Sequence, residues 1–147
     1  MTESSILVVD DNPDHLELTM LALSECCDPA RISTAGDGPD ALDYLFGRGA
    51  HAGRDASRLP RVVLLDMKLV RMHGLEVLKA LRGDPRTAAV PVVMHSSSTE
   101  YSDIAACYAA GANSYVRKAT DFDELRRKMR SVHDYWLTVN ERPRAAG

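Results

Sequence analysis

The sequence lacks a long apolar run and a basic leader. No apolar stretch approaches the roughly 20 residues that span a bilayer, and residues 1–5 carry no basic side chain ahead of the apolar run at 6–9. We therefore expect no membrane contact and no signal peptide, and we expect the protein to act in the cytoplasm.

The sequence has only three cysteines, and neither its cysteines nor its basic residues form a recognisable binding pattern. Cys26, Cys27 and Cys107 form neither an even pairing framework nor a zinc-type CxxC spacing. We interpret them as small, partly buried apolar residues in a reduced compartment. The net charge is −3, and the one basic cluster, residues 126–130, falls on a predicted helix. Nucleic acid is therefore not an expected partner.

The chain is long enough for one globular domain. Its 147 residues, 45% apolar and 27% charged, are typical of a soluble domain with a sizeable core. We expect a single domain over residues 1–147, with a core of about 4–134.

Short apolar runs alternate with helical patterns along the chain, which is typical of βα units. The predicted strands are 6–9, 31–35, 62–65, 92–94 and 114–116. The first, third and fourth are continuously apolar, as central strands covered on both faces are. Asn12 with Pro13, and Asp121 with Glu124, are predicted helix starts. The pattern predicts an α/β fold, a three-layer αβα sandwich around a five-stranded parallel sheet.

Two segments extend beyond the regular alternation of strands and helices. Residues 47–59 have no apolar period and are predicted to form an enlarged loop. The last helix is predicted to be extended, because an apolar stripe continues from Phe122 to Trp136 and Val139 at spacings of three and four. Residues 135–147 would form a C-terminal extension, and Tyr135, Trp136 and Val139 would contact a second copy of the chain.

Polar residues follow four of the predicted strands at their carboxyl ends, where open parallel sheets bind ligands. They are Asp10, Asp11, Asp66, Ser96 and Lys118. Three neighbouring carboxylates repel one another unless a cation lies between them, and Mg²⁺ suits such oxygen ligands. Asp66 would then attack a phosphorus atom to form an aspartyl phosphate, while Ser96 and Lys118 bind the phosphoryl oxygens. Taken singly, each residue could instead be a helix-start acid, a turn residue or a solvated lysine.

Four segments resemble the CheY-like receiver domains of two-component systems. They are LVVDDN at 7–12, LLDMKL at 64–69 with Gly74, PVVMHS at 91–96 and AGANSYVRK at 110–118. The resemblance implies a flavodoxin-like strand order, 2-1-3-4-5, and a phosphoacceptor rather than an enzyme acting on a separate substrate, although it would assist its own phosphorylation and dephosphorylation.

By this resemblance Asp66 is the phosphoacceptor and Lys118 the phosphate-binding lysine. Asp10, Asp11, Asp66 and the backbone carbonyl of Lys68 would hold Mg²⁺. Ser96 and Tyr115 would be the coupled switch pair that controls the surface of helix 4, strand 5 and helix 5. The phosphoryl donor would be a histidine kinase. The enlarged loop and the Tyr-Trp segment resemble regulators paired with bacterial phytochrome kinases, and a homodimer is expected.

Two positions depart from the family pattern. Ala119 follows Lys118 where the family usually has a cis proline, and Val70 replaces a common proline. A non-proline cis bond costs about 3 to 4 kcal/mol, so we expect a trans bond and a looser hold on Lys118. Three alternatives stay open at this point: a haloacid-dehalogenase-like phosphatase, which needs Asp rather than Asn12; a degenerate receiver acting as a phosphorylation-independent interaction module; and a transcription factor, for which no DNA-binding segment is visible.

Overall fold

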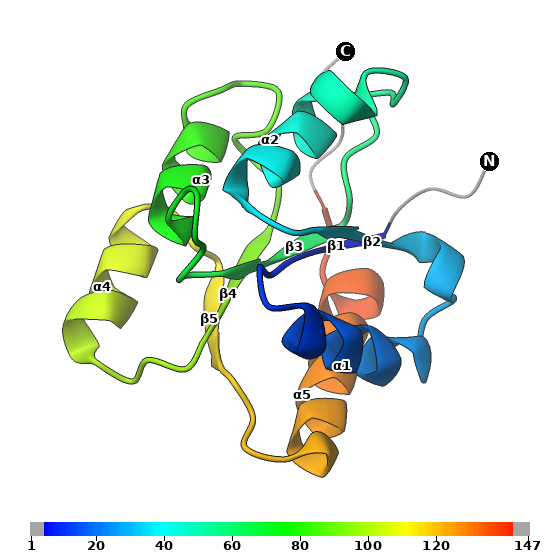
Figure 1. The fold of residues 1–147 in the computed structure, drawn as a ribbon, viewed down its shortest axis with the longest axis vertical. Helices are drawn as coiled ribbons and strands as arrows, with labels where there is room; N and C mark the ends of the chain where they lie inside the picture. The colour runs from blue at the N-terminus through cyan, green and yellow to red at the C-terminus, as the bar shows by residue number, and fades with distance from the viewer. Residues whose placement is uncertain (1–4, 143–147) are drawn as a thin grey trace.

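The computed structural model describes residues 5–142, which form a parallel sheet between two layers of helices (Figure 1). The strands are β1 (Ile6–Val9), β2 (Ile32–Ala35), β3 (Val62–Asp66), β4 (Val92–Ser96) and β5 (Ser114–Arg117). Their order is β2-β1-β3-β4-β5, and all pairs are parallel. The predicted fold and strand order are confirmed, and the three continuously apolar strands lie at the centre of the sheet.

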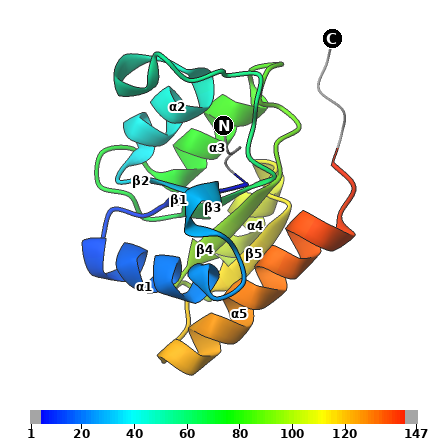
Figure 2. The same cartoon turned by 90° about the vertical axis from the view of Figure 1, so that its right-hand side faces the viewer.

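Helices cover both faces of the sheet. They are α1 (Pro13–Ser24), α2 (Gly38–Phe46), α3 (Gly74–Arg82), α4 (Tyr101–Ala109) and α5 (Phe122–Asp134). The α1 and α5 helices lie side by side on one face, and α2, α3 and α4 lie on the other (Figures 1 and 2). This division follows from right-handed crossovers, because the chain moves one way across the sheet from β1 to β2 and the opposite way from β2 to β5.

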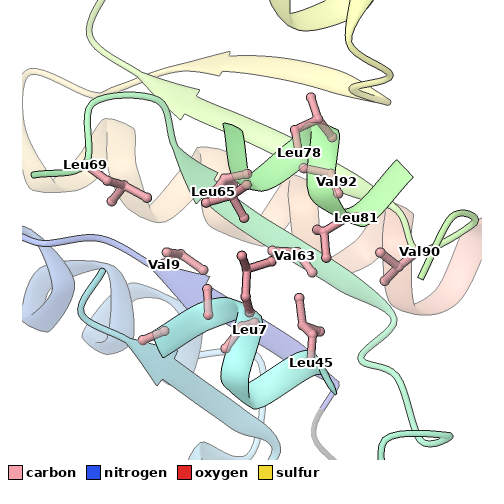
Figure 3. Close-up of a cluster of buried hydrophobic side chains, with 14 of the residues drawn as sticks. Leu7, Val9, Leu45, Val63, Leu65, Leu69, Leu78, Leu81, Val90 and Val92 are labelled. Atoms are coloured by element: carbon pink, nitrogen blue, oxygen red, sulfur yellow. The ribbon is translucent and has the colours of Figure 1, made fainter. Parts of the chain in front are cut away.

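The two faces bury separate apolar clusters. Leu7, Val63 and Leu65 meet Leu45 of α2 and Leu78 of α3 (Figure 3). On the opposite face the strand residues Ile6, Val8, Val62, Leu64 and Val93 pack against α1 and α5. Because both faces are buried, the central strands carry almost no polar side chain until they reach their carboxyl ends.

The helix starts form largely as predicted. The Asn12 side chain accepts hydrogen bonds from the backbone N–H groups of Asp14 and His15, and Pro13 is the first residue of α1. Asp121 accepts a bond from the N–H of Glu124. The Glu124 carboxylate, however, accepts bonds from Thr120 instead of returning to Asp121, so only half of a capping box is made.

Several predicted boundaries need small corrections. The third, fourth and fifth strands end at Asp66, Ser96 and Arg117, one or two residues beyond their predicted ends. Arg31, predicted as the first residue of the second strand, lies in a 3-10 turn (Pro29–Arg31) that Asp28 caps. The predicted loop at 47–59 contains a second 3-10 turn (Gly49–His51) and continues to β3. Arg54 orders this loop, since its guanidinium lies 4.2 Å from the Tyr44 ring centre and donates to the Tyr44 carbonyl oxygen at 2.9 Å.

The last helix is extended, as predicted, by a π-helical turn (Tyr135–Val139). The Arg61 guanidinium donates to the carbonyl oxygen of Leu137 at 2.5 Å, which ties the turn to the start of β3. Trp136 and Leu137 pack against the core beneath α1 and α5. The last part of the expected extension, residues 143–147, lies outside the described residues. Within 5–142, no helix has both the length and the apolar character to cross a bilayer.

Candidate functional site

The carboxyl ends of β1, β3 and β5 bring one lysine and two carboxylates into contact. The Lys118 ammonium lies 2.9 Å from Asp66 Oδ2 and 3.2 Å from Asp10 Oδ2. Both carboxylates are buried, and the Lys118 side chain is only 17% exposed. The backbone N–H of Lys118 also donates to the Ser96 carbonyl oxygen at the end of β4. The structure thus joins residues that lie up to 108 positions apart.

Local backbone contacts orient the two buried carboxylates. Asp10 Oδ1 accepts from the N–H of Asn12 at 2.9 Å, and Asp66 Oδ1 accepts from the N–H of Lys68 at 3.0 Å. Gly74 allows the start of α3 to approach this turn, because a Cβ atom there would lie 2.3 Å from the Asp66 carbonyl oxygen. The Gly74 N–H also donates to the Met67 carbonyl oxygen at 2.8 Å.

Asp11 completes an acidic cluster. Asp10, Asp11 and Asp66 each offer a carboxylate oxygen, and these oxygens all lie within 4.8 Å of one another. Within residues 5–142, and apart from bonds inside helices and strands, no backbone N–H donates to the Lys68 carbonyl oxygen. Hard divalent cations prefer such oxygen donors, and one or two carboxylates with open positions for water or phosphate suit Mg²⁺. The residues present therefore fit a divalent cation.

Burial and the attraction between Asp66 and Lys118 have opposite effects on the pKa of each residue. Burial raises the pKa of Asp66, and the hydrogen bond and positive charge of Lys118 offset this only in part. Burial by itself would lower the pKa of Lys118, but its contacts with Asp66 and Asp10 outweigh burial, so the pKa is raised. Lys118 thus stays a cation at neutral pH and faces a carboxylate that is poorly solvated.

The predicted switch residues, Ser96 and Tyr115, are both bonded to Ser98. Ser96 is buried at the end of β4, and its Oγ accepts from the N–H of Ser98 at 3.1 Å. The Tyr115 hydroxyl donates to the carbonyl oxygen of Ser98 at 2.8 Å. Ser96 and Tyr115 therefore both contact the loop between β4 and α4.

The two departures from the family pattern have different outcomes. No peptide bond within residues 5–142 is cis, so the bond between Lys118 and Ala119 is trans, as expected. Lys118 nevertheless contacts both buried carboxylates, and Ala119 packs against the core beneath α1 and α5. Val70 is 84% exposed on the loop after β3. The absence of proline at position 119 does not prevent the lysine from reaching the site.

Two histidines, His15 and His95, lie near the site. His15 Nδ1 lies 3.5 Å from the Lys118 ammonium, a contact that its place in the first turn of α1 could have indicated. His95 is packed in the interior, since it is 5% exposed, and its Nε2 has no hydrogen-bond partner. Burial, reinforced by the charge of Lys118, lowers the pKa of His95 to about 4.

The residues predicted to contact a second copy differ in exposure. Tyr135 is 48% and Val139 64% exposed, whereas Trp136 packs against the chain's own core. The Trp136 ring lies edge to face with Tyr135, with centroids 4.8 Å apart. Tyr135 and Trp136, but not Val139, line an open groove of about 520 Å³ between β5 and α5, together with Val116 and Val132.

Comparison with known proteins agrees with this geometry. The response regulator receiver domain family matches residues 6–130. The chain is 39% identical over 138 residues to a probable methanogenesis regulatory protein, FilR2, of Methanothrix harundinacea, covering 94% of this chain and 86% of that protein.

Solved structures of phytochrome-associated regulators are also similar. The phosphorylated cyanobacterial phytochrome response regulator RcpA superposes with a TM-score of 0.87 at 29% identity, covering 97% of this chain and 100% of that one. The bacteriophytochrome response regulator AtBRR superposes with a TM-score of 0.74 at 38% identity, covering 96% and 100%. From the match over residues 6–130 and the identity to FilR2, the chain belongs to the response regulator receiver domain family of two-component signalling.

Proposed function

We propose that this protein is a response regulator that accepts a phosphoryl group on Asp66 from a histidine kinase, with Mg²⁺ bound beside it. The observation that carries the proposal is the Lys118 ammonium, 2.9 Å from Asp66 at the edge of a three-carboxylate cluster. A cation and an ammonium on either side of one carboxylate suit phosphoryl transfer, which depends mainly on positioning and charge neutralisation.

In the proposed reaction an Asp66 carboxylate oxygen attacks the phosphorus of a phosphohistidine. The new O–P bond forms as the P–N bond breaks, and the imidazole nitrogen of the kinase keeps the electron pair. Lys118 neutralises charge on the phosphoryl oxygens, and the Ser96 hydroxyl donates a hydrogen bond to one of them. The chain would thus take part in its own phosphorylation and dephosphorylation without acting on a separate substrate.

Asp10, Asp11, Asp66 and the Lys68 carbonyl oxygen would hold the Mg²⁺. When bound, the cation neutralises the clustered carboxylates and draws phosphoryl oxygens toward Asp66. The bonds from Asn12 to Asp10 and from Lys68 to Asp66 keep these carboxylates oriented, so little reorganisation is needed on binding.

A phosphoryl group adds roughly −1.5 to −2 charges beside Ser96 and Lys118. It can shift the protein between two states only through contacts that differ between them. Ser96 and Tyr115 would provide that difference, and the signal would leave through the surface of α4, β5 and α5.

The phosphoryl donor is proposed to be a bacterial phytochrome histidine kinase acting in the cytoplasm. The similarity to RcpA and AtBRR supports this choice, as does the enlarged loop ahead of β3. We propose no nucleic acid or membrane partner, since the net charge is −3 and the basic residues of α5 are partly paired.

A homodimer through Tyr135, Trp136 and Val139 is also proposed. Tyr135 and Val139 provide exposed apolar surface, and Trp136 would support Tyr135 from beneath. Light scattering with and without beryllofluoride measures the mass, and a monomer in both conditions would remove this part of the proposal.

The acceptor assignment is tested by intact-mass measurement after incubation with acetyl phosphate and Mg²⁺. Wild type is expected to gain one phosphoryl group, and Asp66→Asn none, while Asp103→Asn, on α4 away from the cluster, should gain the group as wild type does. Equal labelling of wild type and Asp66→Asn would reject Asp66. The absence of labelling in wild type would favour the phosphorylation-independent interaction module instead.

A further inference from the structure

The Lys118 ammonium has a third partner besides the two buried carboxylates. An ammonium group carries three N–H donors, and the three acceptors around this one are Asp66 Oδ2 at 2.9 Å, Asp10 Oδ2 at 3.2 Å and His15 Nδ1 at 3.5 Å. Because an ammonium only donates, His15 Nδ1 is the acceptor, and the proton of the neutral imidazole lies on Nε2. The distance to His15 is at the outer limit of hydrogen bonding, so this contact is the weakest of the three.

The start of α1 places His15 beside the site. The backbone N–H of His15 donates to Asn12 Oδ1 at 3.2 Å, and the N–H of Asn12 donates to Asp10 Oδ1 at 2.9 Å. One cap therefore orients both the Asp10 carboxylate and the helix turn that carries the imidazole. His15 is exposed, whereas the Lys118 side chain is largely buried, so the imidazole reaches the ammonium from the solvent side of the site.

His15 differs from the other two partners in what happens when the site is filled. Asp10 and Asp66 belong to the acidic cluster, and the proposed Mg²⁺ and phosphoryl group would occupy their oxygens. His15 is outside that cluster, so it can still accept from Lys118 while the other two N–H groups turn to phosphoryl oxygens. The next residue, Ala119, has no ring to fix its φ angle, and the position of the lysine therefore depends more on its side-chain partners.

We propose that His15 is a positioning residue that holds the Lys118 ammonium for phosphoryl transfer to Asp66. The inference rests on the proposed function, because this contact matters to the reaction only if Asp66 is phosphorylated. In this role the imidazole contacts Lys118 and not the phosphoryl group, and only the neutral ring can act. A protonated ring carries N–H groups on both nitrogens, so it offers the ammonium no acceptor and repels it as a like charge.

Other charged or titratable groups lie around His15 on several elements. They are Lys118 after β5, Asp10 and Asp66 beyond its ammonium, His95 of β4 and, on α1 itself, Asp14. Within residues 5–142 no hydrogen bond or ion pair joins His15 to α5. All of these groups are unchanged when His15 is replaced. The labelling rate of a His15 variant relative to wild type therefore isolates the effect of the imidazole.

The test measures how fast acetyl phosphate with Mg²⁺ labels Asp66, by intact mass, at about pH 8 and at about pH 5.5, on either side of the ordinary titration range of an imidazole. His15→Ala removes the acceptor, and His15→Gln keeps an uncharged acceptor of similar reach. Leu18→Ala shortens an exposed neutral side chain one turn further along α1 and is the matched control. Calorimetry measures the Mg²⁺ affinity of each protein, and thermal melts check folding.

At about pH 8, His15→Ala should be labelled about two- to fivefold more slowly than wild type, as expected for the loss of one weak hydrogen bond to a charged group. His15→Gln and Leu18→Ala should match wild type. At about pH 5.5 protonation removes the acceptor from wild type as well, so both His15 variants should be labelled as fast as wild type or faster. The Mg²⁺ affinity should be equal in all four proteins, because His15 is outside the acidic cluster.

A His15→Ala rate equal to that of wild type at both pH values, or a deficit of the same size at both, would overturn the inference and leave Asp66 as the acceptor. A deficit that His15→Gln does not rescue, or that follows a loss of Mg²⁺ affinity, would also overturn it. No labelling of wild type would overturn the proposed function and the role of His15 together.

Discussion

Replacing Asp11 with asparagine is expected to stabilise the fold in the absence of divalent cations. Asp11 lies with Asp10 and Asp66 in the acidic cluster, but the Lys118 ammonium is in contact only with the other two. Asp11→Asn therefore removes two repulsive pairs and no ion pair, and it keeps nearly the same side-chain volume.

The magnitude follows from the separation of the oxygens. Two unit charges 4.8 Å apart repel by about 0.9 kcal/mol in bulk water and about 3.5 kcal/mol at an effective dielectric constant of ~20. Asp11 is partly exposed, so the value per pair is nearer the lower figure, and the attraction between Asp11 and the more distant Lys118 reduces the total. We expect a gain of about 1 to 2 kcal/mol in the free energy of unfolding.

Urea denaturation in EDTA and in MgCl2 provides the assay. A hundredfold excess of Mg²⁺ over its dissociation constant stabilises a native protein by about 2.7 kcal/mol, and each tenfold loss of affinity removes about 1.4 kcal/mol. Asp11→Asn should therefore be more stable than wild type in EDTA and gain less from Mg²⁺. Asp14→Asn, an acid in the first turn of α1 and outside the cluster, serves as the control. A destabilised Asp11→Asn in EDTA, or an equal Mg²⁺ gain in both proteins, would refute the reasoning.

Three further predictions concern Arg82, Gly74 and His95. Arg82→Met should cost about 3 to 5 kcal/mol in urea denaturation, because the guanidinium donates to Gly111, Ala88, Val90 and Asn113; a loss below ~1 kcal/mol would contradict this. Gly74→Ala should lower the melting temperature and slow acetyl phosphate labelling, since its Cβ would lie 2.3 Å from the Asp66 carbonyl oxygen; unchanged melting and labelling would argue against a tight approach. The pKa of His95 is lowered to about 4 in the folded protein. As the pH falls, the His95 imidazole is therefore protonated in the unfolded chain before it is protonated in the folded one. Above about pH 6.5 the free energy of unfolding keeps the whole contribution of the neutral His95 imidazole. It loses roughly 3 kcal/mol of that contribution as the pH falls from there through 4. Denaturation of wild type and His95→Leu at pH 7.5 and 5 should show a smaller loss in the variant, and parallel curves would count against a buried neutral imidazole.

The sequence by itself determined the sheet and most of the site. Continuous apolar runs at β1, β3 and β4 can be covered only from both faces, and this places them at the centre of a parallel sheet. Because parallel strands present their carboxyl ends at one edge, Asp10, Asp66 and Lys118 had to converge there. Strand boundaries were less certain, as Arg31 shows, since the capped 3-10 turn before β2 depends on a local competition that periodicity does not register.

Only the tertiary structure decided how side chains meet across elements. Trp136 belongs to an apolar stripe that could face a partner or the chain itself. In the structure it packs against its own core, next to Leu137, whose carbonyl oxygen accepts a bond from Arg61. Ser98 and Asp103 are ordinary polar residues in sequence, and only the structure shows that Ser98 bonds Asp103, Ser96 and Tyr115 together. Hydrogen bonds of this kind depend on distances of a few tenths of an ångström between elements, which hydrophobic patterning does not specify.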